Sequence, residues 1–486
     1  MSERLLTISD KDNVCVVLDE EGRIPFGHKI AKEDIRKGEP IIKYGYPIGH
    51  ATCDIKKGEH VHVHNLKTNL SGQVEYEYQP NSEEIARFST NETTRSFLGY
   101  EREYGKVGIR NEVWIIPTVG CVNTTAELLA KRASEKYKDI LNESIDGIFA
   151  FTHNMGCSQL GEDHRCTQQI LKGFTMHPNA GAVLVLSLGC ENNNLDEFKP
   201  ILGNTNPQRV KFLVTQEVED ELEAGEALLD ELILYASQSK RTKVPASKLI
   251  VGFKCGGSDA FSGITANPLC GKVNDKIVKE GGSTVLTEVP EMFGAEQILM
   301  ARAIDKNVFK KTVELINNFK NYFTKYGQTI YENPSPGNKQ GGISSLEEKS
   351  LGCIQKGGTA PVVDVLNMGE PVVKKGLSLL NGPGNDQVSA TNLVASGAQM
   401  VLFTTGRGNP FGTAVPTVKI SSNTHLYNKK RNWIDYNAGA ILEGVPLEEV
   451  TEQFLNFLLD VASGKKTKNE QNGYREISIF RDGVIL

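Results

Sequence analysis

Three consecutive segments pair a short apolar run with a loop that carries a Gly-Cys step, and this repetition is the strongest constraint on the fold. The runs are 113–119, 147–152 and 182–187, and the steps that follow them are Gly120-Cys121, Gly156-Cys157 and Gly189-Cys190. At least two of the loops lead into helical patterns, at 126–137 and 167–174. Alternating strands and helices predict a parallel α/β sheet whose loops lie along one edge, where open sheets bind ligands. We therefore expect the Gly-Cys loops to converge.

A further strand, loop and helix pattern begins just past the middle of the chain. The apolar run 249–253 is followed by Cys255-Gly256-Gly257, a polar cluster and a helical pattern over 269–279. Adjacent glycines let a ligand approach the backbone, and the short polar side chains of the cluster can bind it. The sequence predicts a loop that holds a small polar molecule or a metal, with a glycine-rich turn around a buried thiol as the alternative.

The first 75 residues carry short β-branched runs separated by Gly-containing charged turns, which predicts a small β-rich domain. Within it, His60, His62 and His64 alternate with two valines. Side chains alternate along a strand, so we expect the three imidazoles to share one face. Imidazole is a common ligand of Fe, Mn and Zn, and the alternative is the solvent-facing side of an edge strand.

The length of 486 residues and two changes in composition predict three domains. A polar segment over 74–97 and an acidic helical run over 217–247 separate them. We expect a β-rich domain with its linker over 1–95, an α/β domain over 100–245 and a second α/β domain over 246–486. The fold class is therefore multidomain, with parallel, Rossmann-like sheets after the β-rich domain.

The nine cysteines do not predict a disulfide framework, because their number is odd and no export signal precedes them. Five of them lie in Gly-Cys or Cys-Gly steps, the last being Gly352-Cys353. Thiolates suit iron-sulfur clusters, Zn or Fe, but no C-x-x-C motif is present. Tight packing at strand ends is the alternative interpretation.

Acidic and imidazole side chains on the expected strand-end loops are suited to removing a proton next to a carboxylate, beside a divalent metal that stabilises the enediolate. Basic and amide side chains on neighbouring loops are suited to binding the carboxylate and hydroxyl groups of such a substrate. The candidate acids and bases are His153, Glu162, His164, Asp259 and Glu288. The candidate substrate-binding residues are Arg110, Asn111, Ser258, Asn267, Asn338, Lys339 and Arg407. The candidate metal ligands are His62, His64, Cys157 and Cys255.

The overall charge of -6 is mild and its basic residues are dispersed, which argues against a nucleic-acid partner. No window approaches eighteen consecutive apolar residues and no secretory h-region opens the chain. We expect a cytoplasmic protein that forms no membrane span and that assembles, if at all, as a homo-oligomer.

Motifs along nearly the whole chain resemble the altronate/galactarate dehydratase family. They include Gly156-Cys-Ser-Gln-Leu-Gly-Glu-Asp-His164, Cys255-Gly-Gly-Ser-Asp259, Thr287-Glu-Val-Pro-Glu-Met-Phe-Gly-Ala-Glu296 and Tyr331-Glu-Asn-Pro-Ser-Pro-Gly-Asn338. The segment Gly58-Glu-His-Val-His-Val-His-Asn65 resembles the SAF domain that precedes the larger regions of these enzymes.

Within the family, segments such as Tyr44-Gly-Tyr-Pro-Ile-Gly49 are similar to the altronate branch. The resemblance implies loss of water from D-altronate to give 2-dehydro-3-deoxy-D-gluconate in hexuronate breakdown, with Fe(2+) or Mn(2+) as activator. Three alternatives stay open: a related substrate such as galactarate, an iron-sulfur-dependent hydroxyacid dehydratase, and a non-catalytic sugar-acid sensor.

Overall fold

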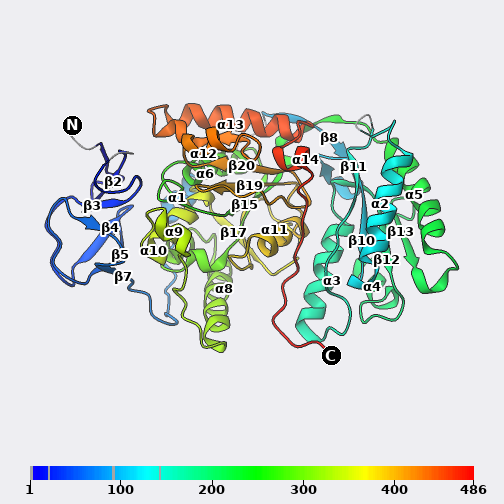
Figure 1. Cartoon of the computed structure of the whole chain (residues 1–486), viewed down its shortest axis with the longest axis horizontal. Helices are drawn as coiled ribbons and strands as arrows, with labels where there is room; N and C mark the ends of the chain where they lie inside the picture. The colour runs from blue at the N-terminus through cyan, green and yellow to red at the C-terminus, as the bar shows by residue number, and fades with distance from the viewer. Residues whose placement is uncertain (1–3, 20–21, 90–93, 142–143) are drawn as a thin grey trace.

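The computed structural model describes residues 4–19, 22–89, 94–141 and 144–486. The molecule is elongated, and three sheet-containing regions follow one another along its long axis (Figure 1). We refer to them as the N-terminal β region, the four-stranded region and the seven-stranded region. The seven-stranded region lies in the middle, with the N-terminal β region at one end and the four-stranded region at the other (Figure 1).

The N-terminal β region consists of two small antiparallel sheets. One contains β1 (Leu5–Leu6), β2 (Val14–Val17), β3 (Lys29–Ala31) and β6 (His60–Val61), and the other β4 (Pro40–Lys43), β5 (Tyr46–Ala51) and β7 (Leu66–Lys67). The strand that carries the histidines, β6, is shorter than the predicted one over 60–64, because a turn at 62–65 follows Val61. Asn65 closes this turn: its backbone N–H donates to the His62 carbonyl and its Oδ1 accepts from the His62 N–H, both at 3.0 Å. Val61 is buried as predicted, whereas Val63 is half exposed.

The predicted polar linker contains one short helix, α1 (Ser82–Arg87), which begins with an Asn81 cap. Residues 90–93 of that linker lie outside the described residues. Before the helix, the linker packs on the seven-stranded region, where the Tyr76 hydroxyl donates to Glu296. The segment therefore runs along the larger region instead of bridging open solvent.

The four-stranded region confirms the expected parallel sheet, in the order β11-β10-β12-β13. Helices α2 and α5 contribute to the core on one face of it and α3 and α4 to the core on the other, so the sheet is the middle of three layers. Its strands are β10 (Glu112–Pro117), β11 (Gly147–Ala150), β12 (Ala180–Ser187) and β13 (Val210–Val214), and its helices are α2 (Asn123–Lys136), α3 (Gly161–Thr175), α4 (Leu195–Leu202) and α5 (Glu221–Ser237). Helix α3 begins six residues earlier than predicted.

The seven-stranded region is also parallel throughout, in the order β17-β18-β16-β15-β19-β20-β21. Its strands are β15 (Ile250–Cys255), β16 (Ser283–Leu286), β17 (Val362–Leu366), β18 (Gly376–Leu380), β19 (Met400–Thr405), β20 (Thr417–Ser421) and β21 (Tyr436–Asn437). Its helices are α6 (Ala266–Lys279), α7 (Glu296–Met300), α8 (Lys306–Lys325), α9 (Pro336–Gln340), α10 (Leu346–Cys353), α11 (Asp386–Ala395), α12 (Thr424–Lys429), α13 (Leu447–Ala462) and α14 (Lys468–Asn472).

The two parallel-sheet regions share one apolar core, in which α3 packs on α11 (Figure 1). A small antiparallel sheet of β8 (Ser96–Glu101), β9 (Val107–Gly108) and β14 (Thr242–Pro245) lies where the chain enters and leaves the four-stranded region. The C-terminal segment then returns to α3, where the backbone N–H groups of Asp482 and Gly483 donate to Asp163. Among the described helices, none combines the length and apolar character that crossing a bilayer requires.

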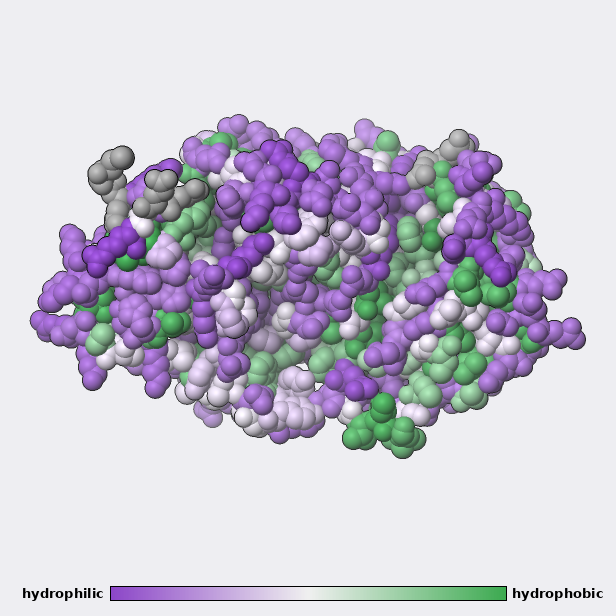
Figure 2. Space-filling view, viewed as in Figure 1, coloured by the Kyte–Doolittle hydropathy of each residue, from purple (hydrophilic) through white to green (hydrophobic). Residues whose placement is uncertain are grey.

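The face of the molecule in Figure 2 is mostly hydrophilic. A group of apolar residues stands out on it where Figure 1 marks the C-terminus. The last three residues, Val484, Ile485 and Leu486, are 78%, 51% and 81% exposed. The end of the chain therefore leaves apolar side chains in water.

A buried carboxylate joins the N-terminal β region to the seven-stranded region. Glu348 on α10 accepts from the ammonium groups of Lys29 at 2.9 Å and Lys43 at 2.7 Å, and all three side chains are buried. Although burial opposes the shift, the two ammonium charges lower the pKa of Glu348 from 4.5 to about 2. Buried charges are tolerated only when they are paired, so this triad ties the two regions together.

Replacing the shared carboxylate tests this attachment. We expect Glu348→Gln to lower the free energy of unfolding by about 3–5 kcal/mol, because it leaves two buried ammonium groups without a counter-charge. The depressed pKa means that the carboxylate stabilises the folded state fully above pH 4.5 and loses this effect as the pH falls toward 2. The difference between the wild type and the variant in chemical denaturation is therefore largest at neutral pH and shrinks in acid.

The matched control is Asp34→Asn, which removes the carboxylate of a surface pair with Lys56 that is well exposed on both sides. Exposed pairs contribute about 0–1 kcal/mol, so this variant should unfold like the wild type. Equal effects of the two substitutions at pH 7 would contradict the role of Glu348.

Candidate active site

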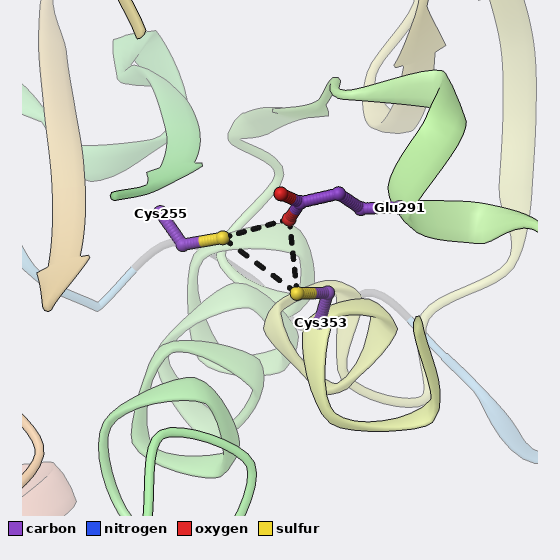
Figure 3. A group of neighbouring side chains, drawn as sticks. All are labelled: Cys255, Glu291 and Cys353. Carbon is purple, nitrogen blue, oxygen red and sulfur yellow. Dashed lines mark hydrogen bonds between the residues drawn. The ribbon is translucent and has the colours of Figure 1, made fainter. Parts of the chain in front are cut away.

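Two thiols and one carboxylate meet in the interior of the seven-stranded region (Figure 3). The Cys255 and Cys353 thiols lie 2.8 Å and 3.0 Å from the same Glu291 oxygen, Oε2, and 3.6 Å from each other. All three side chains are buried. Within the described part of the chain, this is the one group of three His, Cys, Asp or Glu side chains close enough to share a metal ion.

Three different elements bring these side chains together. Cys255 ends β15, where its backbone pairs with Thr404 of β19, so the strand runs two residues beyond the predicted end. Glu291 lies in the single turn Val289–Met292 that follows β16, and Cys353 ends α10. Glu288, just before that turn, has a left-handed backbone with φ of 72°, which is uncommon for a residue with a side chain. Its carboxylate accepts from the Cys255 N–H at 2.9 Å, which fixes the turn against the strand.

Buried lysines surround this group. Lys254 contacts both Glu288 and Asp386, Lys349 lies 2.8 Å from Glu291, and Lys356 lies 3.4 Å from Glu288. Although burial opposes the shift, the charges of Lys349, Lys356 and Lys254 hold the pKa of Glu291 well below its usual range. Burial, reinforced by the charge of Glu291, raises the pKa of Glu288. The hydrogen bond with Cys255 and then burial raise the pKa of the Cys353 thiol.

The charges of this network decide whether a divalent cation fits. Among the described residues named above, three lysines face three carboxylates, so the network is neutral when both thiols keep their protons. Metal ligands must be deprotonated, so an ion with a charge of +2 would replace two thiol protons without changing the balance. Two thiolates and a carboxylate suit Fe(2+) better than Mn(2+), which prefers oxygen ligands. The residues present therefore fit an iron ion.

A cavity of about 470 Å³ opens beside the thiols. Its walls include Cys255, Glu291, Lys349, Asp386 and part of the segment 332–339. Gly257, with φ of 67°, turns the chain at its edge, and Lys349 is fixed by Asn333 at 2.9 Å and Asn338 at 3.2 Å. The side chain of Asp386 is 31% exposed and accepts from Asn409 at 2.7 Å. The cavity thus offers carboxylates, the Cys255 thiol and ammonium groups to one small ligand.

Several predicted substrate-binding residues lie at this cavity. Ser258, Asn338 and Lys339 line it, and Asn338 donates to the Ser258 carbonyl at 2.8 Å. Arg407 is exposed and adjoins the cavity wall: its side chain donates to Gln340 at 2.9 Å, and its backbone N–H donates to the carbonyl of Gly257 at 3.0 Å. In the described part of the chain, the Lys339 ammonium has no hydrogen bond or ion pair, which leaves it available to an anion.

Two other residues predicted on the same loop are used by the protein itself. Asp259 accepts from Ser262, Ser422 and Asn423, and burial raises its pKa. Asn267 donates to the Gly352 carbonyl at 3.0 Å and accepts from Thr404 at 2.7 Å. Both side chains hold loops in place beneath the cavity instead of lining it.

Arg110 and Asn111 are fully buried and bind other parts of the protein. The five N–H groups of Arg110 bind Glu470 and three backbone carbonyls, and the side chain is fully buried. Asn111 donates to the carbonyls of Ser144 and Ala236 and is also buried. Neither has a free donor for a substrate carboxylate, and both lie outside the lining of the cavity at Cys255.

The Gly-Cys loops of the four-stranded region converge at one edge of their own sheet, as the strand pattern predicts. Gly120 N–H donates to the Met155 carbonyl at 3.0 Å, and Ser158 N–H donates to Asn192 at 2.8 Å. Cys121, Cys157 and Cys190 are exposed there. Among the described residues, however, no member of these loops lines the cavity at Cys255.

Three candidate acids or bases lie near this second edge. His153 is buried with both ring nitrogens bonded, to the Pro117 carbonyl at 2.8 Å and to the Met155 N–H at 3.1 Å, and burial lowers its pKa to about 4. Because α3 begins at Gly161, Glu162 and His164 lie on its first turn and not on a loop. Glu162 is exposed and pairs with Arg165. Cys157 and the candidate acids or bases His153, Glu162 and His164 therefore do not lie in one cavity with Cys255.

Two histidines of the N-terminal β region contact the backbone of α9, the short helix in the cavity wall. His62 Nε2 lies 2.9 Å from the Lys339 carbonyl, and His28 Nε2 lies 3.2 Å from the Gln340 carbonyl. These bonds hold α9 in place, and its residues Pro336, Asn338 and Lys339 line the cavity. His64 is exposed and its ring lies 5.3 Å from that of His60. The structure does not bring His62 or His64 together with Cys157 or Cys255.

Sequence reasoning missed the lysines and Asp386, and it did not place Glu291 and Cys353 together. Lys254 interrupts an otherwise apolar strand, and a lysine at such a position was the available signal for a buried charge. Asp386 follows the loop 381–385, whose Gly and Asn content gave no indication of a partner.

Three family models match successive parts of the chain. The altronate/galactarate dehydratase SAF domain matches residues 18–69, the second domain of D-galactarate dehydratase/altronate hydrolase matches 99–237, and the C-terminal D-galactarate/altronate dehydratase domain matches 246–485.

Curated relatives match over nearly the full length. Altronate dehydratase of Bacillus subtilis is 54% identical over 97% of this chain and 94% of its own, and that of Escherichia coli is 49% identical over 98% and 94%. Galactarate dehydratase (L-threo-forming) of Escherichia coli is 33% identical over 99% of this chain and 97% of its own. With matches that span all three sheet regions, the chain belongs to the altronate/galactarate dehydratase family.

Proposed function

We propose that the chain is a D-altronate dehydratase, which removes one water from D-altronate to give 2-dehydro-3-deoxy-D-gluconate in hexuronate breakdown. The near-full-length identity to two altronate dehydratases carries this proposal. The cavity at Cys255 supports it, because an aldonate needs cations for its carboxylate and an elimination needs a base near them.

We propose further that Cys255, Cys353 and Glu291 hold Fe(2+) at the inner wall of the cavity. When bound, the ion would supply positive charge that stabilises the enediolate formed at the substrate carboxylate. The ligand set does not extend to His62, His64 or Cys157, because these lie elsewhere in the structure.

The chain's own residues divide the remaining work. Lys339, which lines the cavity, and Arg407, which adjoins Gly257 in its wall, would bind the substrate carboxylate, with the guanidinium offering two parallel donors. Asp386, partly exposed in the cavity and oriented by Lys254 and Asn409, would take the proton from C2. Passing that proton to the C3 hydroxyl releases one water, and the enol then tautomerises to the 2-keto acid. Glu291 is less suited as the base because its side chain is buried and is one of the three proposed iron ligands, whereas the side chain of Asp386 is 31% exposed.

The organisation around this site is part of the proposal. We propose domain limits of 1–95, 100–245 and 246–486, and Rossmann-like winding of the two parallel sheets, since helices contribute to the cores on both faces of the four-stranded sheet. A cytoplasmic location and a homo-oligomeric assembly stay predictions from the sequence.

A substrate panel tests the function directly. We expect the purified protein with added Fe(2+) to convert D-altronate to a 2-keto acid, and to act on other hexonates and on hexarates at least ten-fold more slowly. The keto acid is measured by its semicarbazone absorbance. Faster turnover of galactarate would assign the chain to the other named activity of its family, and the absence of product from every acid would favour a sensor.

The same preparation addresses the iron-sulfur alternative. Purification without oxygen, followed by visible absorption and by iron and sulfide analysis, should give iron without acid-labile sulfide. Sulfide in a fixed ratio to iron would instead indicate a cluster, for which the exposed thiols of the four-stranded region would be the candidates.

Asp386→Asn should reduce kcat for altronate by about 10²–10⁴-fold, the usual contribution of a positioned general base. The matched control is Glu332→Gln, which removes an exposed carboxylate from the same cavity wall and should change kcat less than three-fold. The unfolding temperature of both variants is measured as well, because Asp386→Asn also removes a counter-charge of the buried Lys254 and could destabilise the fold. An Asp386→Asn enzyme with more than a tenth of the wild-type kcat would remove Asp386 from the mechanism.

Cys353→Ser should weaken Fe(2+) binding at least ten-fold, because it replaces a thiolate ligand with a hydroxyl that stays protonated at neutral pH. Anaerobic calorimetric titration with Fe(2+) alone measures this without reference to turnover. Cys157→Ser, which alters an exposed thiol on the other region, is the control and should bind iron as the wild type does. Identical titrations for both variants would rule out the proposed iron site.

A further inference from the structure

A second cavity of about 470 Å³ lies between the four-stranded and the seven-stranded regions. The C-terminal end of α3 and the turn after it form one side, and the end of α11 with the loop 369–375 forms the other. It shares no lining residue with the cavity at Cys255. A ligand bound here would touch both regions at once.

Lysines from both sides line this second cavity. Lys106 and Lys172 come from the four-stranded side, and Lys248 and Lys375 come from the seven-stranded side. Within the described residues, no aspartate or glutamate lines it. Four positive charges thus border a single space without a carboxylate among its walls, the reverse of the balanced network around Glu291.

The hydrogen bonds of these lysines leave much of their capacity unused. Lys248 donates to the Gly105 carbonyl at 3.1 Å and Lys375 to the Ser247 carbonyl. For Lys106 and Lys172, the described part of the chain shows no hydrogen bond or ion pair to the ammonium group. Burial, and then the charges of Arg209 and Lys172, lower the pKa of Lys106, and burial followed by the charge of Lys248 lowers that of Lys375. These cations repel one another, and an anion between them would relieve that repulsion.

Most of the wall between the lysines is apolar. It includes Val107, Met176, Pro178, Leu202, Ile250 and Val372. Small-molecule sites typically combine such walls with a few polar groups, in volumes of about 300–1,000 Å³. The sugar acid of the proposed reaction carries a hydroxyl on almost every carbon and gains nothing from apolar walls.

We propose that this cavity is a binding site for an amphiphilic organic anion, whose acidic group pairs with the lysines and whose apolar body lies between α3 and α11. The pairing supplies long-range attraction and the apolar walls supply most of the contact area. Because the ligand contacts both regions only in the folded chain, its binding stabilises their association.

The probe for a test is 8-anilino-1-naphthalenesulfonate, which joins a sulfonate to an apolar aromatic body. We expect saturable binding of one probe per chain in calorimetric titration, and a rise in the unfolding temperature with probe concentration. The double variant Lys106→Glu/Lys172→Glu should bind the probe at least ten-fold more weakly. Inorganic sulfate, which has the charge but no apolar body, should compete only at millimolar concentrations, and D-altronate should compete no better than sulfate.

The matched control is Lys131→Glu, which reverses an exposed lysine on α2 in the same region and outside the cavity. Its probe affinity should stay within two-fold of the wild type, and none of the variants should change turnover of altronate without probe. If the double variant fails to fold by circular dichroism, Lys248→Glu/Lys375→Glu on the opposite side replaces it. Binding that is absent in the wild type, unchanged in the cavity variants, or weakened equally by Lys131→Glu would overturn the proposal.

Discussion

The compensation of buried charge around Glu291 is the constraint on which the rest of the seven-stranded region depends. Lysine and carboxylate groups at this depth are costly to bury singly, because the interior cannot replace the water that solvates them. The network therefore requires that β15, the turn after β16, α10 and the start of α11 all be in place together. A loop that shifted by a few ångströms would leave one of these charges without its partner.

The same logic extends outward to the N-terminal β region. The helix that carries Cys353 and Lys349 on its inner side also carries Glu348, which binds Lys29 and Lys43. Two successive residues of α10 thus belong to different networks: Lys349 to the one around the thiols, and Glu348 to the one that attaches the N-terminal β region. Tyr44 of the N-terminal β region also lies close to the site, where it lines a narrow space together with Cys353 and Lys349. Although His28 and His62 bind backbone carbonyls of α9 and do not line the cavity, the N-terminal β region contacts α9 and α10, two of the three helices that border it.

The fold could be predicted further than the site. Parallel sheets followed from alternating apolar runs and helical patterns, because that alternation is a local property of the sequence. The predicted histidine strand was too long, because the side chain of Asn65 closes a turn that the β-branched pattern did not reveal.

The site could not be predicted in the same way, because it depends on how the two sheets are oriented relative to each other. The edge with Cys157 and the edge with Cys255 have the same local sequence character, but with α3 packed on α11 no described residue of the Cys157 edge lines the cavity at Cys255. Glu162 and His164 were assigned to a loop because the first turn of α3 has few apolar residues, although its acidic residues suit a helix N-terminus.

Packing α3 on α11 therefore has two consequences for how the molecule handles charge. It separates the exposed thiols from the buried ones, so that only the buried pair lies beside a carboxylate that lysines keep ionised. It also creates the space between the regions where four lysines meet without a carboxylate among the described lining residues. In the interior, every lysine of the Glu291 network is matched, because an unmatched charge there would cost more than the fold can supply. Between the regions, Lys106, Lys248 and Lys375 are exposed and Lys172 is partly exposed, so water offsets part of that cost even though partial burial lowers the pKa of Lys106 and Lys375. The two cavities thus differ in solvent access. This difference explains why the lysines around Glu291 are balanced by carboxylates, whereas the four lysines of the second cavity are not.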